Sequence, residues 1–163
     1  MIEEGSGNLL TADVEALINT VNPVGVMGKG IALQFKRAYP ANYKAYRSAC
    51  QRGEVHLGQM FVFDTGIKGS RRYLINFPTK QHWKSASRLE DIQSGLDDLV
   101  RVVNEHGIFS VAIPALGCGY GGLDWEQVRP MIETAVERMP HVRAVIFAPA
   151  GAPAPATMPN ATL

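Results

Sequence analysis

Two glycine-rich segments constrain this chain most, because each lies between an apolar run and the expected start of a helix. One covers residues 114–123 and follows the apolar run 110–113, and the other covers residues 25–32 and follows the run 17–21. Glycine lacks a Cβ atom, so such loops turn sharply and present backbone N–H groups to an anion, while the helix N-terminus adds partial positive charge. The two loops together predict a site for a diphosphate.

The remaining segments predict an α/β fold. Further strands are expected from β-branched and aromatic content at residues 59–63, 72–77 and 144–148. Helices are expected at residues 30–39, 42–52, 89–106 (after a capping-box sequence at 87–90) and 125–139 (capped by Asp124). Alternating strands and helices are typical of a layered sheet that binds ligands where loops leave the carboxyl ends of its strands.

Length and composition predict one globular domain followed by a tail. The chain has 163 residues, of which 46% are hydrophobic and 19% charged, and this is enough for a full core. We assign residues 1–149 to the domain. Residues 150–163 are rich in Ala, Pro, Gly, Thr and Asn, so we expect a disordered tail or linker.

Charge and cysteine content exclude several classes of protein. A formal net charge of +1 argues against a polycation that coats duplex DNA. Cys50 and Cys118 are the only cysteines, and no His/Cys cluster has ligand spacing, so we expect no disulfide framework, metal site or cofactor. No apolar run approaches the roughly 20 residues of a membrane span, and we expect a cytoplasmic protein without membrane contacts.

The first glycine loop fits neither standard nucleotide-binding motif. A Walker A motif needs Ser or Thr after its lysine, whereas Lys29 is followed by Gly30 and Ile31. The glycines at 25, 28 and 30 follow a GxxGxG spacing, which is not the GxGxxG of a Rossmann fingerprint.

The segment does resemble the macrodomain family, whose first ligand loop reads VNxAN before a glycine cluster and a helix. Here residues 18–22 read Ile-Asn-Thr-Val-Asn, and residues 114–121 resemble the second macrodomain loop. The resemblance extends from Gly7 to the last expected strand. It implies a three-layer α/β/α fold with a mixed central sheet, and a site for ADP-ribose with its diphosphate between the two loops.

The same resemblance implies roles for individual residues. Asn22 would bind the distal ribose, and Asn8 stands where an aspartate usually accepts from the adenine amino group, with Leu9 offering its backbone. Asn19 is expected to be a buried structural residue that satisfies neighbouring backbone groups. The glycine loops would surround the ribose and phosphates through Gly28, Gly30, Ile31, Gly117, Cys118, Gly119, Tyr120 and Gly121.

Residues 76–80 resemble the lysine-bearing loop of the macrodomain branch that contains terminal ADP-ribose protein glycohydrolase. Together with Trp83 and Lys84, this segment is more similar still to a branch that removes ADP-ribose from thymidine in DNA. The resemblance makes Lys80 the catalytic candidate, since Gly121 and Gly122 stand where another branch has its aspartate. Lys80 could donate a proton to the base or, as a neutral amine, attack ribose C1″.

Trp83 and Lys84 are candidates for nucleic-acid contact. An exposed Trp stacks on an unpaired base while nearby cations neutralise phosphates, a pattern suited to single-stranded DNA. A Trp packed under its loop with solvated cations around it is an equally good interpretation.

The resemblance as a whole implies an ADP-ribosyl glycohydrolase acting on thymidine in single-stranded DNA, an antitoxin to a DNA ADP-ribosyltransferase toxin. The toxin would contact a separate C-terminal region. Two alternatives stay open: a reader that binds ADP-ribose without turnover, and a hydrolase of ADP-ribose esters on protein glutamates.

Overall fold

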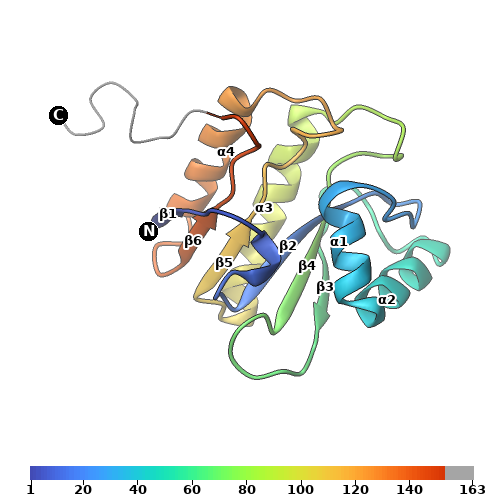
Figure 1. Ribbon diagram of the computed structural model, residues 1–163, viewed down its shortest axis with the longest axis horizontal. Coiled ribbons are helices and arrows are strands. Elements are labelled where there is room, and N and C mark those ends of the chain that lie inside the picture. The colour runs from blue at the N-terminus through green and yellow to red at the C-terminus, as the bar shows by residue number, and fades with distance from the viewer. Residues whose placement is uncertain (153–163) are drawn as a thin grey trace.

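The computed structural model describes residues 1–152 and contains a six-stranded sheet in the order β1-β6-β5-β2-β4-β3 (Figure 1). The strands are β1 (Ile2–Glu4), β2 (Ala16–Val21), β3 (Phe61–Asp64), β4 (Tyr73–Pro78), β5 (Ser110–Ile113) and β6 (Arg143–Ile146). The helices are the short 3₁₀ helix η1 (Leu9–Thr11), α1 (Gly30–Ala38), α2 (Pro40–Gln51), α3 (Leu89–His106) and α4 (Trp125–Glu137). Within residues 1–152, no helix is long and apolar enough to cross a membrane.

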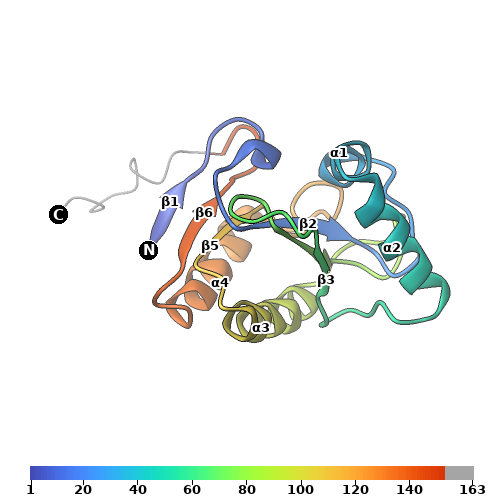
Figure 2. The same cartoon turned by 90° about the horizontal axis from the view of Figure 1, so that it is seen from below.

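The central strands are buried on both faces, so successive side chains enter two different cores. Figure 2 shows α3 and α4 on one side of the sheet and α1 on the other. The core beneath α3 and α4 takes Ala16, Ile18, Ile75, Phe77, Val111, Ile113, Ala144 and Ile146. The alternate residues Leu17, Leu74, Ala112 and Val145 pack with Leu9 of η1 and Phe35 of α1. This arrangement confirms the expected three-layer α/β/α architecture.

Five of the six strands run parallel, and only β3 is antiparallel, to β4. The carboxyl ends of β2, β4, β5 and β6 therefore meet at one edge of the sheet. The antiparallel β3–β4 pair makes the sheet mixed, as expected. The turn-rich segment between these two strands is short enough to connect them directly.

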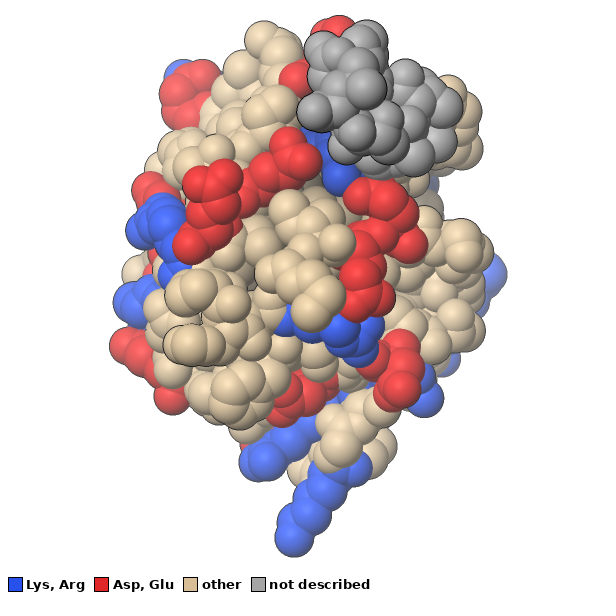
Figure 3. All heavy atoms as spheres, turned by 90° about the vertical axis from the view of Figure 1, so that its left-hand side faces the viewer, with Lys and Arg blue, Asp and Glu red and all other residues tan. Residues whose placement is uncertain are grey.

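Strand β1 was missed by sequence reasoning because it has only three residues and two of them are glutamates paired with distant arginines. It pairs with β6 at the sheet edge, where Glu3 contacts Arg143 and Glu4 forms a two-point ion pair with the buried Arg129 of α4 at 2.8 and 2.5 Å. The face over these elements carries both signs of charge intermixed (Figure 3). Neither positive nor negative charge dominates this face of the protein.

The expected capping box at residues 87–90 is wrong. Helix α3 begins at Leu89, its N-cap is Arg88, and no side chain caps it. The Ser87 backbone N–H instead donates to the Gly121 carbonyl of the second glycine loop, at 2.9 Å. Asp124 does cap α4, accepting from the Glu126 N–H at 3.0 Å, as predicted.

Several ends differ from the expected ones by a few residues. Strand β3 begins at Phe61 and not at Gln59, because the Met60 N–H leaves the ladder and donates to the Asp98 carboxylate of α3 at 2.7 Å. Helix α2 begins at Pro40, which occupies the first helical turn, where its missing N–H is not needed. The assignment of residues 150–163 to a tail lies almost wholly outside the described residues.

The strand that leads to Lys80 is fixed from below by a close contact between Phe77 and Gly95 of α3. A Cβ atom at Gly95 would lie 2.3 Å from Cε1 of the buried Phe77 ring. The bare backbone of Gly95 thus lets α3 approach β4.

We expect Gly95→Ala to lower the free energy of unfolding by about 1–3 kcal/mol through overpacking. Helix propensity alone would raise the stability, because alanine is a better helix former than glycine by about 1 kcal/mol. The sign of the change in unfolding free energy therefore shows whether packing or helix propensity dominates. Urea denaturation measures it. Ser94→Ala, at the exposed neighbouring position, is the control and should change stability by less than about 0.5 kcal/mol. Equal or higher stability of Gly95→Ala would contradict the packing argument.

Candidate functional site

A cleft of about 1220 Å³ lies where the parallel strands end. Its lining includes residues from the segments at the ends of β6 (147–150), β5 (114–121 without Leu116 and Cys118), β2 (Val21–Asn22) and β4 (Thr79–Lys80), together with residues 5–9 and 28–32. Three strand spacings separate β6 from β4, so the cleft crosses roughly 14 Å of sheet. It is therefore elongated and can hold a ligand with two distinct ends.

The first loop is held in shape by the side chain of Asn22. Its Oδ1 accepts from the N–H groups of Val24 and Gly25 at 3.0 and 3.1 Å, and its Nδ2 donates to the Val26 carbonyl at 3.0 Å. The buried Tyr46 hydroxyl of α2 donates to the Asn22 carbonyl at 2.5 Å. One N–H of the Asn22 amide remains for a ligand.

Helix α1 presents an uncapped N-terminus to the cleft. Its N-cap is Lys29, whose side chain cannot accept a hydrogen bond, and Gly30, Ile31 and Ala32 of the first turn line the cleft. The first N–H groups of a helix have no partner within the helix. Free N–H groups and the helix dipole are the features of an anion site, and the prediction that this loop binds an anion stays a prediction.

The second loop contributes its backbone but no helix N-terminus. Gly117 adopts a left-handed φ of 73°, its carbonyl accepts from the Leu123 N–H at 2.9 Å, and Gly121 lies directly over it. The start of α4 lies outside the cleft lining, and Asp124 places a carboxylate there. The expectation that both loops add a positive helix end is therefore wrong for the second loop.

Lys80 follows β4 and enters the cleft from the end opposite residues 147–150. The Thr79 N–H donates to the Val21 carbonyl at 3.0 Å, which extends the β2–β4 ladder to the residue before the lysine. Burial lowers the pKa of Lys80, and the positive charge of Lys29 lowers it further. A lysine in this position has a larger neutral fraction than one in water.

A chain of buried amides lies beneath the site. Asn76 of β4 accepts from Asn19 of β2 at 3.2 Å and exchanges hydrogen bonds with Asn42 of α2 at 3.3 and 2.9 Å. Asn19 also donates weakly to the Met27 sulfur at 3.8 Å. Asn19 is thus buried and structural, as predicted, but its recorded partners are side chains and not the backbone groups we expected.

Trp83 lies at the mouth of the cleft beside Lys80 and is 42% exposed. Its ring is 5.1 Å from the His82 ring, and the Lys84 ammonium lies 4.8 Å from its centre. The His82 Nδ1 accepts from the Lys84 N–H at 3.1 Å. The interpretation of a Trp packed under its loop is therefore wrong, since the ring is partly open to solvent.

The charges in the cleft are all positive. Among its described lining residues, Lys29 and Lys80 carry the only charged side chains, and none is a carboxylate. Within residues 1–152, no group of three His, Cys, Asp or Glu side chains could hold a metal ion. The groups available for chemistry in this lining are amines, amides, hydroxyls and backbone.

Most of the residues predicted from the sequence meet in this cleft. The lining contains Asn8, Leu9, Asn22, Gly28, Gly30, Ile31, Lys80, Trp83, Gly117, Gly119, Tyr120 and Gly121. Cys118 and Lys84 are outside it: the Cys118 thiol packs on the core, donates to the Leu116 carbonyl, and has its pKa raised by burial to about 11. The Asn8 amide oxygen accepts from the Leu10 N–H at 3.0 Å.

Sequence reasoning missed Lys29 as a site residue, and it missed the segments 5–7 and 147–150. Lys29 was visible within the first glycine loop, and its position between two cleft glycines was the available signal. The other two segments carry no local motif. Residues 147–150 join the site because β6 pairs with β5, and residues 5–7 join it because β1 pairs with β6.

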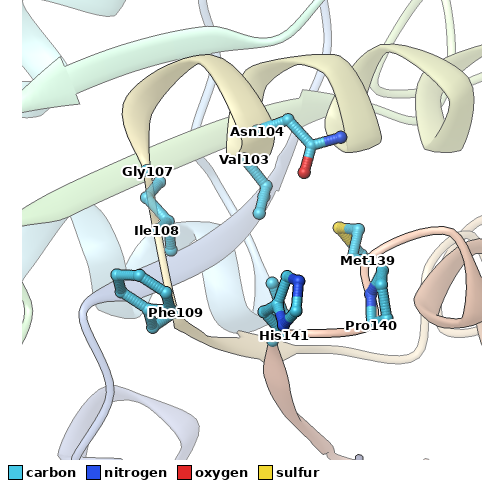
Figure 4. Close-up of a pocket in the computed structure, with 9 residues that line it drawn as sticks. Val103, Asn104, Gly107, Ile108, Phe109, Met139, Pro140 and His141 are labelled. Atoms are coloured by element: carbon cyan, nitrogen blue, oxygen red, sulfur yellow. The ribbon is translucent and has the colours of Figure 1, made fainter.

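A second hollow of about 180 Å³ lies at the other end of the sheet, between the end of α3 and the turn that precedes β6 (Figure 4). Its walls are mainly apolar, with Val103, Ile108, Phe109 and Met139 around His141. It contains none of the predicted site residues. The large cleft is therefore the candidate site.

Comparisons with known proteins agree with this geometry. A family model described as the Macro domain matches residues 18–132. The DNA ADP-ribosyl glycohydrolase of Mycobacterium tuberculosis is 58% identical over 151 residues, which are 93% of this chain and 43% of that protein. The solved macrodomain of Mycobacterium tuberculosis DarG has a TM-score of 0.90 at 58% identity, over 92% of this chain and 99% of that one.

A more distant relative carries a second activity in its name. The DNA ADP-ribosyl transferase-DNA ADP-ribosyl glycohydrolase fusion protein of Thermosipho africanus is 36% identical, over 77% of this chain and 36% of the relative. The solved structure of Thermosipho africanus DarTG in complex with ADP-ribose has a TM-score of 0.85 at 32% identity, over 92% of this chain and 42% of that chain.

The chain spans less than half the length of these curated relatives. The family model nevertheless covers most of the chain, and the fold, the two glycine loops and their order all agree with it. The chain belongs to the macro domain family.

Proposed function

We propose that this chain is an ADP-ribosyl glycohydrolase that removes ADP-ribose from thymidine bases of single-stranded DNA. The 58% identical relative is named a DNA ADP-ribosyl glycohydrolase. The observation that carries the proposal is the placement of Lys80 at one end of an anion-binding cleft whose described lining has no carboxylate. The identity of 58% to a protein named for DNA ADP-ribosyl glycohydrolysis selects the substrate class.

ADP-ribose fits the elongated cleft in one direction. Its diphosphate lies between the N-terminus of α1 and the second loop, because free N–H groups and positive charge gather there. The adenine then lies at the β6 end, against Leu9 and the Phe147 ring, with Asn8 beside it. The distal ribose lies at the β4 end, where the remaining amide N–H of Asn22 donates to a hydroxyl and C1″ faces Lys80.

Lys80 supplies the chemistry that a carboxylate provides in other hydrolases. Cleavage of the bond from C1″ to the base nitrogen adds water across it: the hydroxyl goes to C1″ and a proton to the base. A lowered pKa makes the ammonium a better proton donor and the amine a more available nucleophile. Both roles require a lysine that changes its protonation state.

Trp83 is the proposed contact for the nucleic acid. Its partly exposed ring stands beside Lys80, so it is within reach of the thymine that carries the ADP-ribose or of the next base. Lys84, stacked on the same ring outside the cleft, then faces the DNA backbone. Stacking of this kind selects single strands, since a duplex hides its base faces.

The biological partner in this proposal is a DNA ADP-ribosyltransferase toxin of the DarT type, whose modification the chain reverses. The Thermosipho africanus protein joins both activities by name in one polypeptide. We propose that contacts to the toxin itself use a region beyond this macrodomain.

We expect Gly121→Ala to raise the Kd for ADP-ribose at least about tenfold, or about 1.4 kcal/mol. The new Cβ would lie 2.5 Å from the Gly117 carbonyl oxygen, so the second loop must move. Gly95→Ala is the control, because a Cβ atom there is equally crowded but Gly95 lies outside the cleft lining. Calorimetric titration measures both, and an equal loss of affinity in the two variants would contradict the packing of this loop.

We expect Lys80→Ala to slow release of ADP-ribose from a thymidine-modified oligonucleotide by at least about 100-fold while ADP-ribose binding persists. Lys80→Arg keeps the charge but cannot change protonation at neutral pH, so it should fail as well. The assay follows single-turnover release, with ADP-ribosylated glutamate on a protein as the competing substrate.

The outcomes of this assay separate the alternatives. Binding without release by the parent protein would make it a reader and overturn the proposal. Faster release from the protein substrate than from DNA would make it an ester hydrolase. Full activity of Lys80→Arg would show that Lys80 acts only through a fixed positive charge and does not change its protonation state.

A further inference from the structure

Lys29 joins the two glycine loops across the mouth of the cleft. Its ammonium lies 5.2 Å from the centre of the Tyr120 ring, within the range of a cation–π contact. The same ring lies over Gly30, where a Cβ atom would be 3.5 Å from its Cε2. Both side chains are exposed and line the cleft, so the contact bridges the start of α1 and the second loop.

Tyr120 holds an ammonium that would otherwise move freely in solvent. Lys29 is the N-cap of α1 and makes no capping hydrogen bond, so nothing in the helix itself requires a lysine at this position. With Lys80, it is one of two ammonium groups in the described lining. The ring thus holds the second positive charge at the cleft whose lining also contains Lys80.

The surroundings of Lys80 contain no described carboxylate that would cancel this charge. Lys29 and Tyr120 line the same cleft from the two glycine loops, and His82 and Lys84 follow Lys80 on its own segment. Burial is the first cause of the lowered pKa of Lys80, and Lys29 is the second. Among these groups, Lys29 is the one whose charge lowers the pKa of Lys80.

We propose that Lys29 is a positioning residue that acts through Lys80: the Tyr120 ring holds its ammonium across the cleft, where it sets the electrostatic environment in which Lys80 works. This inference rests on the proposed glycohydrolase function of the same site. It assigns Lys29 and Tyr120 a part in the reaction beyond enclosing the ligand.

The sign of the effect does not depend on the chemical role of Lys80. Removal of the Lys29 charge stabilises protonated Lys80 and raises its pKa. If Lys80 acts as a neutral nucleophile, the rising limb of the pH profile moves to higher pH. If it acts as a proton donor, the falling limb moves to higher pH.

The test is Lys29→Met in the full chain, read in two ways. Nuclear magnetic resonance of isotope-labelled lysine follows the titration of the Lys80 side chain without any substrate. The pH profile of kcat/KM on the modified oligonucleotide follows the same group in the free enzyme. We expect both midpoints to shift to higher pH, with Lys29→Arg restoring them.

Two further variants define the contact. Tyr120→Leu removes the ring and should move the Lys80 titration in the same direction as Lys29→Met. Tyr120→Phe keeps the ring and should leave the Lys80 titration unchanged. Lys36→Met is the matched control, because Lys36 lies over the Tyr43 ring at 4.6 Å outside the cleft lining. It should leave the Lys80 titration unchanged.

An unchanged Lys80 titration in Lys29→Met would overturn the inference, whatever the enzyme's activity. A shifted titration with an unshifted profile would overturn it as a statement about the reaction, and would show that Lys80 does not control turnover. Loss of all activity in the parent protein, with the titration shifted as expected, would instead contradict the proposed function.

Discussion

The parallel pairing of β2 with β4 is the interaction on which the site depends. Its register runs from Ala16 opposite Tyr73 to Val21 opposite Pro78, and the hydrogen bond from Thr79 to Val21 carries it one residue further. Asn22 and Lys80, distant in sequence, therefore leave the sheet side by side. A shift by one residue would turn Lys80 to the other face. The buried amide chain through Asn76 opposes such a shift, because it would leave several amide groups unpaired.

The sequence was informative wherever the signal was local. Glycine loops between apolar strands and helices indicated two walls of the cleft. The resemblance of residues 76–80 to a lysine-bearing loop singled out Lys80, which lines the same cleft. What could not be read locally depends on contacts between distant residues. Strand β1 is held by ion pairs from Glu3 and Glu4 to Arg143 and Arg129, and nothing around Ile2 indicates a strand.

The errors have related causes. The Ser87 motif has the form of a helix cap, but the Ser87 N–H is used by the second glycine loop, so the tertiary contact overrides the local one. The helix after the second loop has a dipole like any other, but the Asp124 side chain accepts from the Glu126 N–H and the start of the helix lies outside the cleft lining. Spacing alone does not show which helix end a ligand reaches.

Positive charge and burial serve two purposes in this cleft. In the proposed function, backbone N–H groups and two lysines attract the diphosphate, and the described lining offers no carboxylate to repel it. The same burial and the same neighbouring charge lower the pKa of Lys80. In this account, the groups that bind the substrate also prepare the residue that acts on it.

The most direct test is a crystal structure of Lys80→Ala with an oligonucleotide carrying ADP-ribose on thymidine. The account predicts the diphosphate between the α1 N-terminus and the second loop, C1″ beside position 80, and the thymine or its neighbour against Trp83. A distal ribose at the β6 end, or a thymine remote from both position 80 and Trp83, would contradict it.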